Sequence, residues 1–246
     1  PARVEAMVSG GQVVQFHRRP AEPTLDELIA RRVTFLTDYQ NAALAARFTA
    51  LVQRVRAADP SAEDKGSLTR AVAQSWFKLL AVKDEWEVAR LYADPSFRQE
   101  LDRTFEGDYT LHFHVGAWPF ARRDAVTGKV VKAELGPWLM KAFGVMAKFR
   151  GLRGSLFDPF RNSDERKLER ALVAGFEADV TRLLAGLNDG NYRTAVAIAS
   201  LPMRVRGFGH VKQAAADTVA GERDTLFATY GGQAVVRELK RAGAQA

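Results

Sequence analysis

Apolar residues recur at helical spacing along most of the chain. The first such segment begins at Thr24, where Thr24 and Glu27 have the spacing of a capping box, and it extends to about Arg56, before an Asp-Pro pair. A second segment starts at Ser67 and continues to about Leu91. Helices of this length are held mainly by packing rather than by intrinsic propensity, so we expect them to pack against one another.

Helix caps, prolines and glycines bound the remaining periodic segments. They predict five further helices, over about 94–105, 136–149, 162–186, 192–200 and 210–230. The adjacent Gly231 and Gly232 are expected to end the last helix, which leaves 231–246 as a flexible C-terminal tail. Residues 1–23, which contain glycine and proline, are interpreted as a linker or as the tail of a preceding domain.

The hydrophobic period changes from about 3.6 to 2 after Gly107. Apolar residues at 109, 111, 113 and 115 alternate with Thr110, His112 and His114, which is typical of a half-buried strand. Residues 129–134 can return as its partner, so we predict a hairpin at about 109–134. The expected fold is mainly α, with about seven helices packed as an irregular bundle and one small antiparallel β-hairpin, in a single domain over 24–230.

Composition narrows the class of protein. Hydrophobic residues make up 47% and charged residues 26% of the 246 residues, which excludes a wholly disordered chain. No run of 18 apolar residues occurs, so we expect no membrane span. The absence of cysteine excludes disulfides, thiolate zinc sites and cysteine-ligated iron–sulfur clusters, and it fits a cytoplasmic location.

The positive charge is concentrated in one stretch. The chain has a formal net charge of +7, and residues 120–170 alone contain 12 Lys or Arg against 6 Asp or Glu. Such a stretch would attract phosphate, nucleic acid, a carboxylated substrate or an acidic partner protein. The alternative is a solvated basic surface that keeps the protein soluble.

A glycine-containing turn before the last predicted helix is the sharpest local motif. Its two glycines free the backbone, and the helix start behind it offers unpaired N–H groups to a carboxylate or phosphate. The candidate anion or partner contacts are Arg204, Arg206, Gly207, Gly209, His210 and Lys212. The alternative is an ordinary interhelical turn with basic surface residues.

No catalytic or metal-ligating set emerges from the remaining residues. His112 and His114 lie two residues apart on the predicted strand, but a metal needs a third ligand, and only two further histidines exist. We therefore predict no metal site and no catalytic residue in this chain.

An ordered set of short segments resembles one known family. The segments are 25–33, 35–37, 39–42, 77–81, 83–85, 87–92, 105–108, 112–114, 121–124, 136–138, 152–154, 157–160, 165–172 and 206–212. Together they resemble the C-terminal domain of the bacterial fused indolepyruvate ferredoxin oxidoreductases, over roughly 24–230.

The resemblance implies an accessory or assembly domain of an enzyme that oxidatively decarboxylates aryl-pyruvates and passes electrons to ferredoxin. It also implies that thiamine diphosphate, magnesium and iron–sulfur clusters are bound elsewhere in the assembly, and that this chain is not catalytic by itself. Its partners would be the other oxidoreductase domains or subunits, and ferredoxin.

An accessory domain should expose apolar residues where its partner is missing. The candidates for this partner interface are Trp118, Phe120, Phe157 and Phe160. The alternative function is a basic helical module that binds nucleic acid or another polyanion, which would require the basic residues of 120–170 to share one exposed face.

Overall fold

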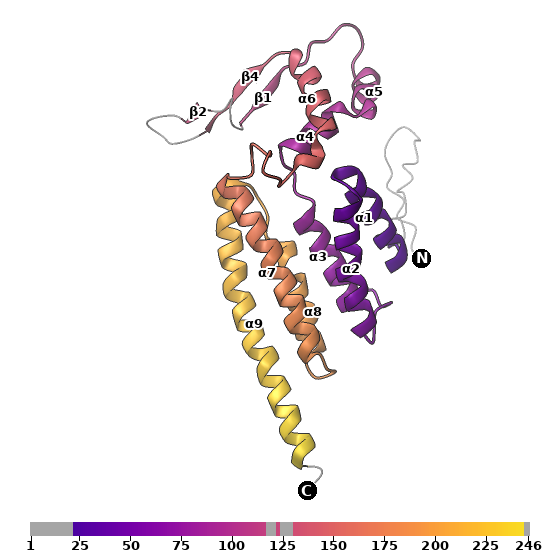
Figure 1. Ribbon diagram of the computed structural model, residues 1–246, viewed down its shortest axis with the longest axis vertical. Coiled ribbons are helices and arrows are strands. Elements are labelled where there is room, and N and C mark those ends of the chain that lie inside the picture. Colours follow the sequence, from indigo (N-terminus) through magenta and orange to yellow (C-terminus); the bar gives the residue numbers. More distant parts are fainter. Residues whose placement is uncertain (1–21, 117–121, 124–129, 244–246) are drawn as a thin grey trace, which may run out of the picture.

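The computed structural model describes residues 22–116, 122–123 and 130–243. Six helices form an elongated bundle, and three other helices with a β-hairpin form a distal lobe at one end of it (Figure 1). The bundle helices are α1 Leu25–Tyr39, α2 Ala42–Ala58, α3 Leu68–Leu80, α7 Asp164–Gly186, α8 Tyr192–Ser200 and α9 Gly209–Gly243. The helices of the distal lobe are α4 Glu85–Ala93, α5 Pro95–Thr104 and α6 Trp138–Lys148. Two short 3-10 helices, η1 Arg150–Leu152 and η2 Leu201–Arg204, follow α6 and α8.

Side-chain caps set the start of many of these helices. The predicted capping box is present, since Thr24 accepts from the backbone of Glu27 and the Glu27 carboxylate accepts from the backbone of Thr24. The other capping side chains at predicted helix starts are Ser67, Asp94 and Ser163. The mainly helical class is therefore confirmed.

The described residues contain nine α-helices, more than the seven or so predicted. The predicted helix from Thr24 to Arg56 is two helices, because Asn41 accepts from the backbone N–H of Leu44 at 2.9 Å and starts α2 anew. The segment beginning at Ser67 is also two helices, because Asp84 caps α4 in the same way. In both places a short polar side chain offers the backbone an alternative to helix continuation.

α9 continues through Gly231 and Gly232 to Gly243, so the predicted break at these glycines was wrong. Glycine costs a helix only about 1 kcal/mol relative to alanine, which does not forbid helical backbone. The far end of α9 extends beyond the other bundle helices (Figure 1). No helix in the described ranges is both long enough and apolar enough to cross a bilayer.

The hairpin is confirmed as a small antiparallel structure built from two short ladders. Strand β1 Phe113–Val115 pairs with β4 Ala133–Leu135, and Phe113 lies opposite Leu135. Within it, β2 Arg122–Arg123 pairs with β3 Val130–Val131. The ladders are shorter than the alternating sequence predicted, since the described strands begin only at Phe113.

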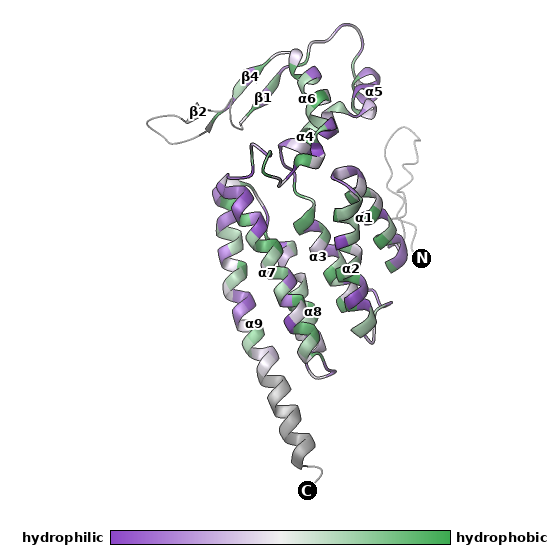
Figure 2. Cartoon of the chain, viewed as in Figure 1, coloured by the Kyte–Doolittle hydropathy of each residue, from purple (hydrophilic) through white to green (hydrophobic). Residues whose placement is uncertain are grey.

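Two hydrophobic cores hold the two parts of the molecule. α3 lies among the bundle helices and is coloured hydrophobic over much of its length (Figure 2). Trp76 of α3 is fully buried and stacks on Phe176 of α7, with ring centroids 6.0 Å apart. In the distal lobe, Phe113 and Phe143 pack around Tyr92 of α4, each at a centroid distance of 5.3 Å from it.

Arg153 joins the distal lobe to the bundle. Its guanidinium donates to both carboxylate oxygens of Asp84, at 2.6 and 2.9 Å, and to the carbonyl oxygen of Tyr39 at 2.7 Å. The same group lies 3.6 Å from the centroid of the Tyr39 ring. Nearby, the indole of Trp86 donates to the buried carboxylate of Asp158. These contacts fix the segment that leads from α6 to α7.

Candidate functional site

A cavity of about 290 Å³ lies where the end of α3, the first half of α7, η2 and the start of α9 meet. Four basic side chains and one carboxylate are among the residues around it. Its lining residues are Lys78, Leu79, Ala81, Val82, Lys83, Glu169, Leu172, Pro202, Val205, Arg206, Gly207, Phe208 and Lys212. We refer to it as the cationic pocket.

Lys78 is one of the positively charged residues that line this pocket. Its ammonium donates to the carbonyl oxygens of Pro202 at 2.9 Å and Met203 at 2.8 Å, so it caps the end of η2. Burial lowers the pKa of Lys78 below its ordinary value, and the nearby charges of Arg206 and Lys212 lower it further. Lys78 is therefore close enough to Arg206 and Lys212 for both of their charges to disfavour its protonated form.

Arg206 is an exposed cation without a carboxylate partner among the described side chains. Its Nε donates only to the carbonyl oxygen of Met203, at 3.4 Å. Lys83 is likewise exposed and forms no ion pair within the described part of the chain. The positive charges of these two side chains are therefore available to an incoming anion.

Lys212, in contrast, is neutralised locally. Its side chain is 14% exposed and forms an ion pair with Glu169, and it lies 3.9 Å from the carboxylate of Glu165. Arg166 pairs with the other oxygen of Glu169. Burial raises the pKa of Glu169, although the hydrogen bond from Lys212 and the charge of Arg166 oppose that rise. Glu169 thus balances positive charge of Lys212 and Arg166 at one side of the pocket.

The glycine turn shapes the mouth of the pocket. Gly207 has φ +97°, a backbone conformation that side chains disfavour, and a Cβ atom there would lie 2.6 Å from Cγ1 of Val211. This turn lies between Arg206 and Lys212, and the two residues line the same cavity. The first turn of α9, which begins at Gly209, follows immediately and has backbone N–H groups without intrahelical partners.

The structure brings only part of the predicted anion-contact set together. Arg206, Gly207 and Lys212 line the pocket, whereas Arg204 forms an ion pair with Glu222 of α9. Gly209 and His210 line a neighbouring cleft of about 770 Å³ instead.

Sequence reasoning missed Lys78 and Lys83. They lie more than 120 residues before the turn, and a lysine on the polar side of a helix or in a polar loop gives no signal of its own.

The predicted partner-interface residues differ in their environments. Phe157 is 80% exposed. Phe160 is half-buried, and its ring packs edge-on against Trp86 at a centroid distance of 5.8 Å. Trp118 and Phe120 lie outside the described residues.

Within the described ranges, no group of three or more His, Asp or Glu side chains is arranged to hold a metal ion. His112 pairs with a strand neighbour, since its Nδ1 lies 2.8 Å from a carboxylate oxygen of Glu134. The cationic pocket is lined by no serine, histidine or cysteine side chain. Its arrangement suits the binding of a compact anion beside an apolar wall.

The chain belongs to a protein family of unknown function, DUF6537, whose model matches residues 25–225. No curated protein and no solved structure matches the chain.

Proposed function

We propose that this chain is an accessory domain of an indolepyruvate, or related 2-oxoacid, ferredoxin oxidoreductase, and that its cationic pocket receives an anionic group of the assembly. The ordered set of segments that resembles the C-terminal domain of these enzymes supports the first part of the proposal. The resemblance also places thiamine diphosphate, magnesium and the iron–sulfur clusters on other domains, so this chain contributes binding rather than chemistry.

The observation that carries the second part is the excess of unpaired positive charge in the pocket. Lys78, Lys83 and Arg206 converge on one cavity without a carboxylate partner among the described residues. Native proteins seldom gather like charges without a reason, because their repulsion is unfavourable until an opposite charge arrives. A bound anion would relieve that repulsion.

The anion can be a substrate carboxylate, a phosphate of coenzyme A or an acidic side chain of a neighbouring domain. All three offer oxygen atoms to charged N–H donors. A charge-assisted hydrogen bond of this kind contributes about 1.5–3 kcal/mol when it is shielded from water, and much less when it is exposed. Arg206 is exposed in this chain, so its full contribution requires that a ligand or neighbouring domain covers it.

The contacts of the basic stretch favour this proposal over a module that binds nucleic acid. Arg153 pairs with Asp84, and Arg166 pairs with Glu169, in both cases with little exposure. Lys167 pairs with Asp164. A polyanion needs free cations on one exposed face, whereas several basic residues of 120–170 already hold this chain together.

The pocket can be tested on the purified chain by calorimetric titration with coenzyme A and, separately, with inorganic diphosphate. Arg206→Gln should weaken binding about tenfold or more, since about 1.4 kcal/mol corresponds to a factor of ten. Arg204→Gln is the matched control, because Arg204 lies two residues away but is paired with Glu222. Equal effects of the two variants, or binding that neither variant changes, would contradict the pocket.

The accessory role is tested by co-expressing the chain with the catalytic domains of the indolepyruvate ferredoxin oxidoreductase of the same genome. We expect one complex to co-purify, and we expect its activity to depend on this chain. A chain that never joins the complex, with a normal fold by circular dichroism, would refute the accessory role while leaving anion binding to be judged by the titration.

A further inference from the structure

A second cavity adjoins the cationic pocket. It has a volume of about 400 Å³, and Leu79, Val82 and Glu169 line both cavities. It lies where α1, α2, α3 and α7 meet the segment that leads from α6 to α7 (Figure 1). We call it the arginine pocket, because five arginines are among its lining residues: Arg47, Arg153, Arg161, Arg166 and Arg170.

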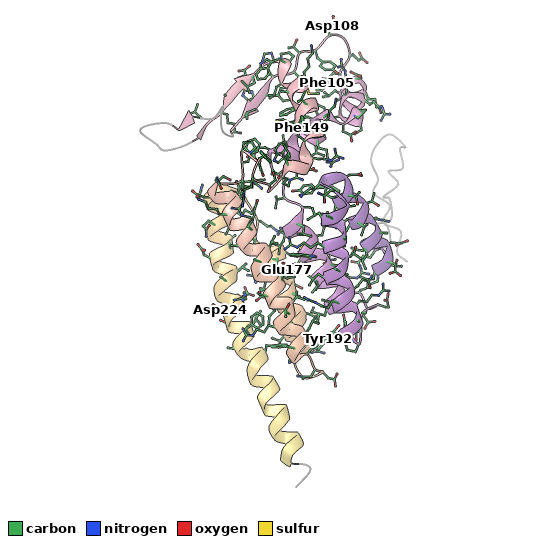
Figure 3. The ribbon with its side chains drawn as sticks, in the orientation of Figure 1. Phe105, Asp108, Phe149, Glu177, Tyr192 and Asp224 are labelled. Carbon is green, nitrogen blue, oxygen red and sulfur yellow. The ribbon has the colours of Figure 1, made fainter. Side chains whose placement is uncertain are left out.

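Three of these arginines are paired with carboxylates of the chain. Arg153 and Arg166 each pair with a buried carboxylate. Arg47 pairs with Glu177 at 2.6 Å, and Figure 3 labels Glu177 on α7. The positive charges of these three side chains are therefore balanced within the protein.

Arg161 and Arg170 have no carboxylate partner among the described residues. The side chain of Arg161 is half-buried, and it forms no hydrogen bond or ion pair within that part of the chain. Arg170 is exposed, and its guanidinium donates only to the carbonyl oxygen of Arg161, at 2.7 Å. This hydrogen bond links the two residues whose charges are not balanced.

Arg166 adds a further donor. Its Nε is buried and has no acceptor among the described residues, although another nitrogen of the same guanidinium pairs with Glu169. Buried N–H groups of native proteins almost always have an acceptor. An oxygen atom of a ligand in this cavity would supply one.

The carboxylates that line the arginine pocket limit the charge of its ligand. They are Asp84, Asp158 and Glu169, and all three are buried. Each already accepts hydrogen bonds from groups of this chain, so none needs a further cation. They repel a singly charged ligand less than a doubly charged phosphate. The cavity therefore favours a monoanion such as a carboxylate.

Most of the remaining lining residues are apolar. Leu44 of α2, Val82 and Val173 of α7 are half-buried and line the cavity. Small-molecule sites combine an apolar lining with a few polar groups and have volumes of about 300–1,000 Å³. A cavity of about 400 Å³ suits a small organic molecule rather than a nucleotide or a protein segment.

We propose that the arginine pocket binds a small organic acid, with its carboxylate on Arg161 and Arg170 and its apolar body against the leucine and valine side chains. The planar fork of a guanidinium matches the two oxygen atoms of a carboxylate, which a lysine ammonium does not. This site is additional to the cationic pocket. It does not depend on the accessory role, because both arginines belong to this chain.

The purified full chain can be titrated with benzoate and followed by calorimetry or by broadening of the NMR lines of benzoate. Benzoate joins a carboxylate to an apolar ring, so it probes both parts of the cavity. Acetate lacks the apolar body and benzyl alcohol lacks the charge, so each should bind more weakly by about tenfold or more. Phenyl phosphate that binds more tightly than benzoate would overturn the assignment to a monocarboxylate.

Arg161→Gln should weaken benzoate binding by about tenfold or more. It should leave the unfolding temperature unchanged, because this side chain forms no hydrogen bond or ion pair among the described residues. Arg170→Gln should also weaken binding, and Arg170→Lys should restore only part of it, since lysine keeps the charge but not the fork. Arg193→Gln is the matched control, because Arg193 of α8 is exposed, forms no ion pair within the described residues and does not line the cavity.

Ala174→Phe tests the apolar part of the cavity without a change of charge. Ala174 of α7 is exposed and lines the cavity, so a larger side chain there competes with the body of the ligand. We expect this variant to weaken benzoate binding about tenfold, whereas Ala174→Ser, which adds little volume, should not. Benzoate binding that Ala174→Phe leaves unchanged would refute the placement of the apolar body. The unfolding temperature establishes that each variant is folded.

Two results would refute the arginine pocket as a whole. One is benzoate binding that Arg206→Gln removes and Arg161→Gln leaves intact, which would assign the ligand to the cationic pocket. The other is the absence of saturable benzoate binding to the folded wild-type chain. Neither result bears on diphosphate binding at the cationic pocket or on assembly with the catalytic domains.

Discussion

Replacing Gly207 by alanine is the most direct test of the turn that forms the cationic pocket. The added Cβ would lie 2.6 Å from Cγ1 of Val211 and 3.0 Å from its Cβ, and the backbone at this residue has φ +97°. The first of these contacts is closer than real Cβ atoms show, and the second is tighter than most of them. The variant must therefore either strain the turn or move the start of α9.

The magnitude follows from two additive causes. An L-residue at positive φ costs about 1–2 kcal/mol, and overpacking against a neighbour costs about 1–3 kcal/mol, so Gly207→Ala should destabilise the turn by about 2–5 kcal/mol. For a chain of this size, one kcal/mol shifts the unfolding temperature by about 2–4 °C. We expect a decrease in unfolding temperature of roughly 4–20 °C and a weaker affinity for diphosphate.

Alanine substitutions at two other glycines distinguish the backbone contribution from the steric contribution. Gly209 has φ +53° but open space around its Cβ position, so Gly209→Ala should show only the backbone contribution of about 1–2 kcal/mol. Gly66 has neither positive φ nor a close neighbour, so Gly66→Ala should be neutral or stabilise by up to about 1 kcal/mol. Adding Val211→Ala to Gly207→Ala should recover much of the steric contribution.

The assay is thermal and urea unfolding followed by tryptophan fluorescence, together with calorimetric titration of diphosphate. The reasoning would be refuted if Gly207→Ala were no more destabilising than Gly209→Ala. It would also be refuted if removing the Val211 side chain gave no recovery. Either result would mean that the turn does not have the conformation described.

Three further predictions concern stability, pH and activity. Arg153→Ala should destabilise the chain by about 3–5 kcal/mol, because it leaves the buried Asp84 carboxylate unpaired; Arg153→Lys should recover only part of this in the same unfolding assay. Affinity for sulfate should fall as the pH rises toward 10, earlier than an ordinary lysine predicts, because burial lowers the pKa of Lys78 and the neutral amine no longer attracts an anion. Lys78→Arg should lose that part of the pH dependence, and an unchanged titration curve would contradict the role of Lys78. The purified chain alone should not reduce any acceptor with indolepyruvate, coenzyme A and thiamine diphosphate, and turnover free of contaminating enzyme would refute the accessory reading.

The sequence by itself determined the class of fold and many of its boundaries. Local signals were sufficient where one or two residues determine where a helix begins. Thr24 and Glu27 form the predicted capping box of α1, and Pro95 follows the predicted cap at the start of α5. The hairpin also followed from the change of period after Gly107. These features depend on contacts within a few residues, which periodicity and capping chemistry report directly.

Tertiary structure decided where long helical segments divide and continue. Asn41 and Asp84 can sit inside a helix or cap a new one, and packing of α1 against α2 and of α4 against α6 selects the cap. Gly231 and Gly232 show the opposite case, since the helix continues through residues that weaken it. Intrinsic propensities of about 1 kcal/mol or less are too small to settle either outcome.

Only the residues of the candidate site that lie close together in the sequence could be predicted. The turn with Arg206, Gly207 and Lys212 stands out in the sequence because the glycines and the helix start are adjacent. Lys78 and Lys83 join it only because the end of α3 packs beside η2, which no pattern within either segment encodes. Arg204, two residues from Arg206, forms an ion pair with Glu222 instead. Charge was therefore visible in the sequence, but which charges meet, and which are neutralised, depends on long-range packing.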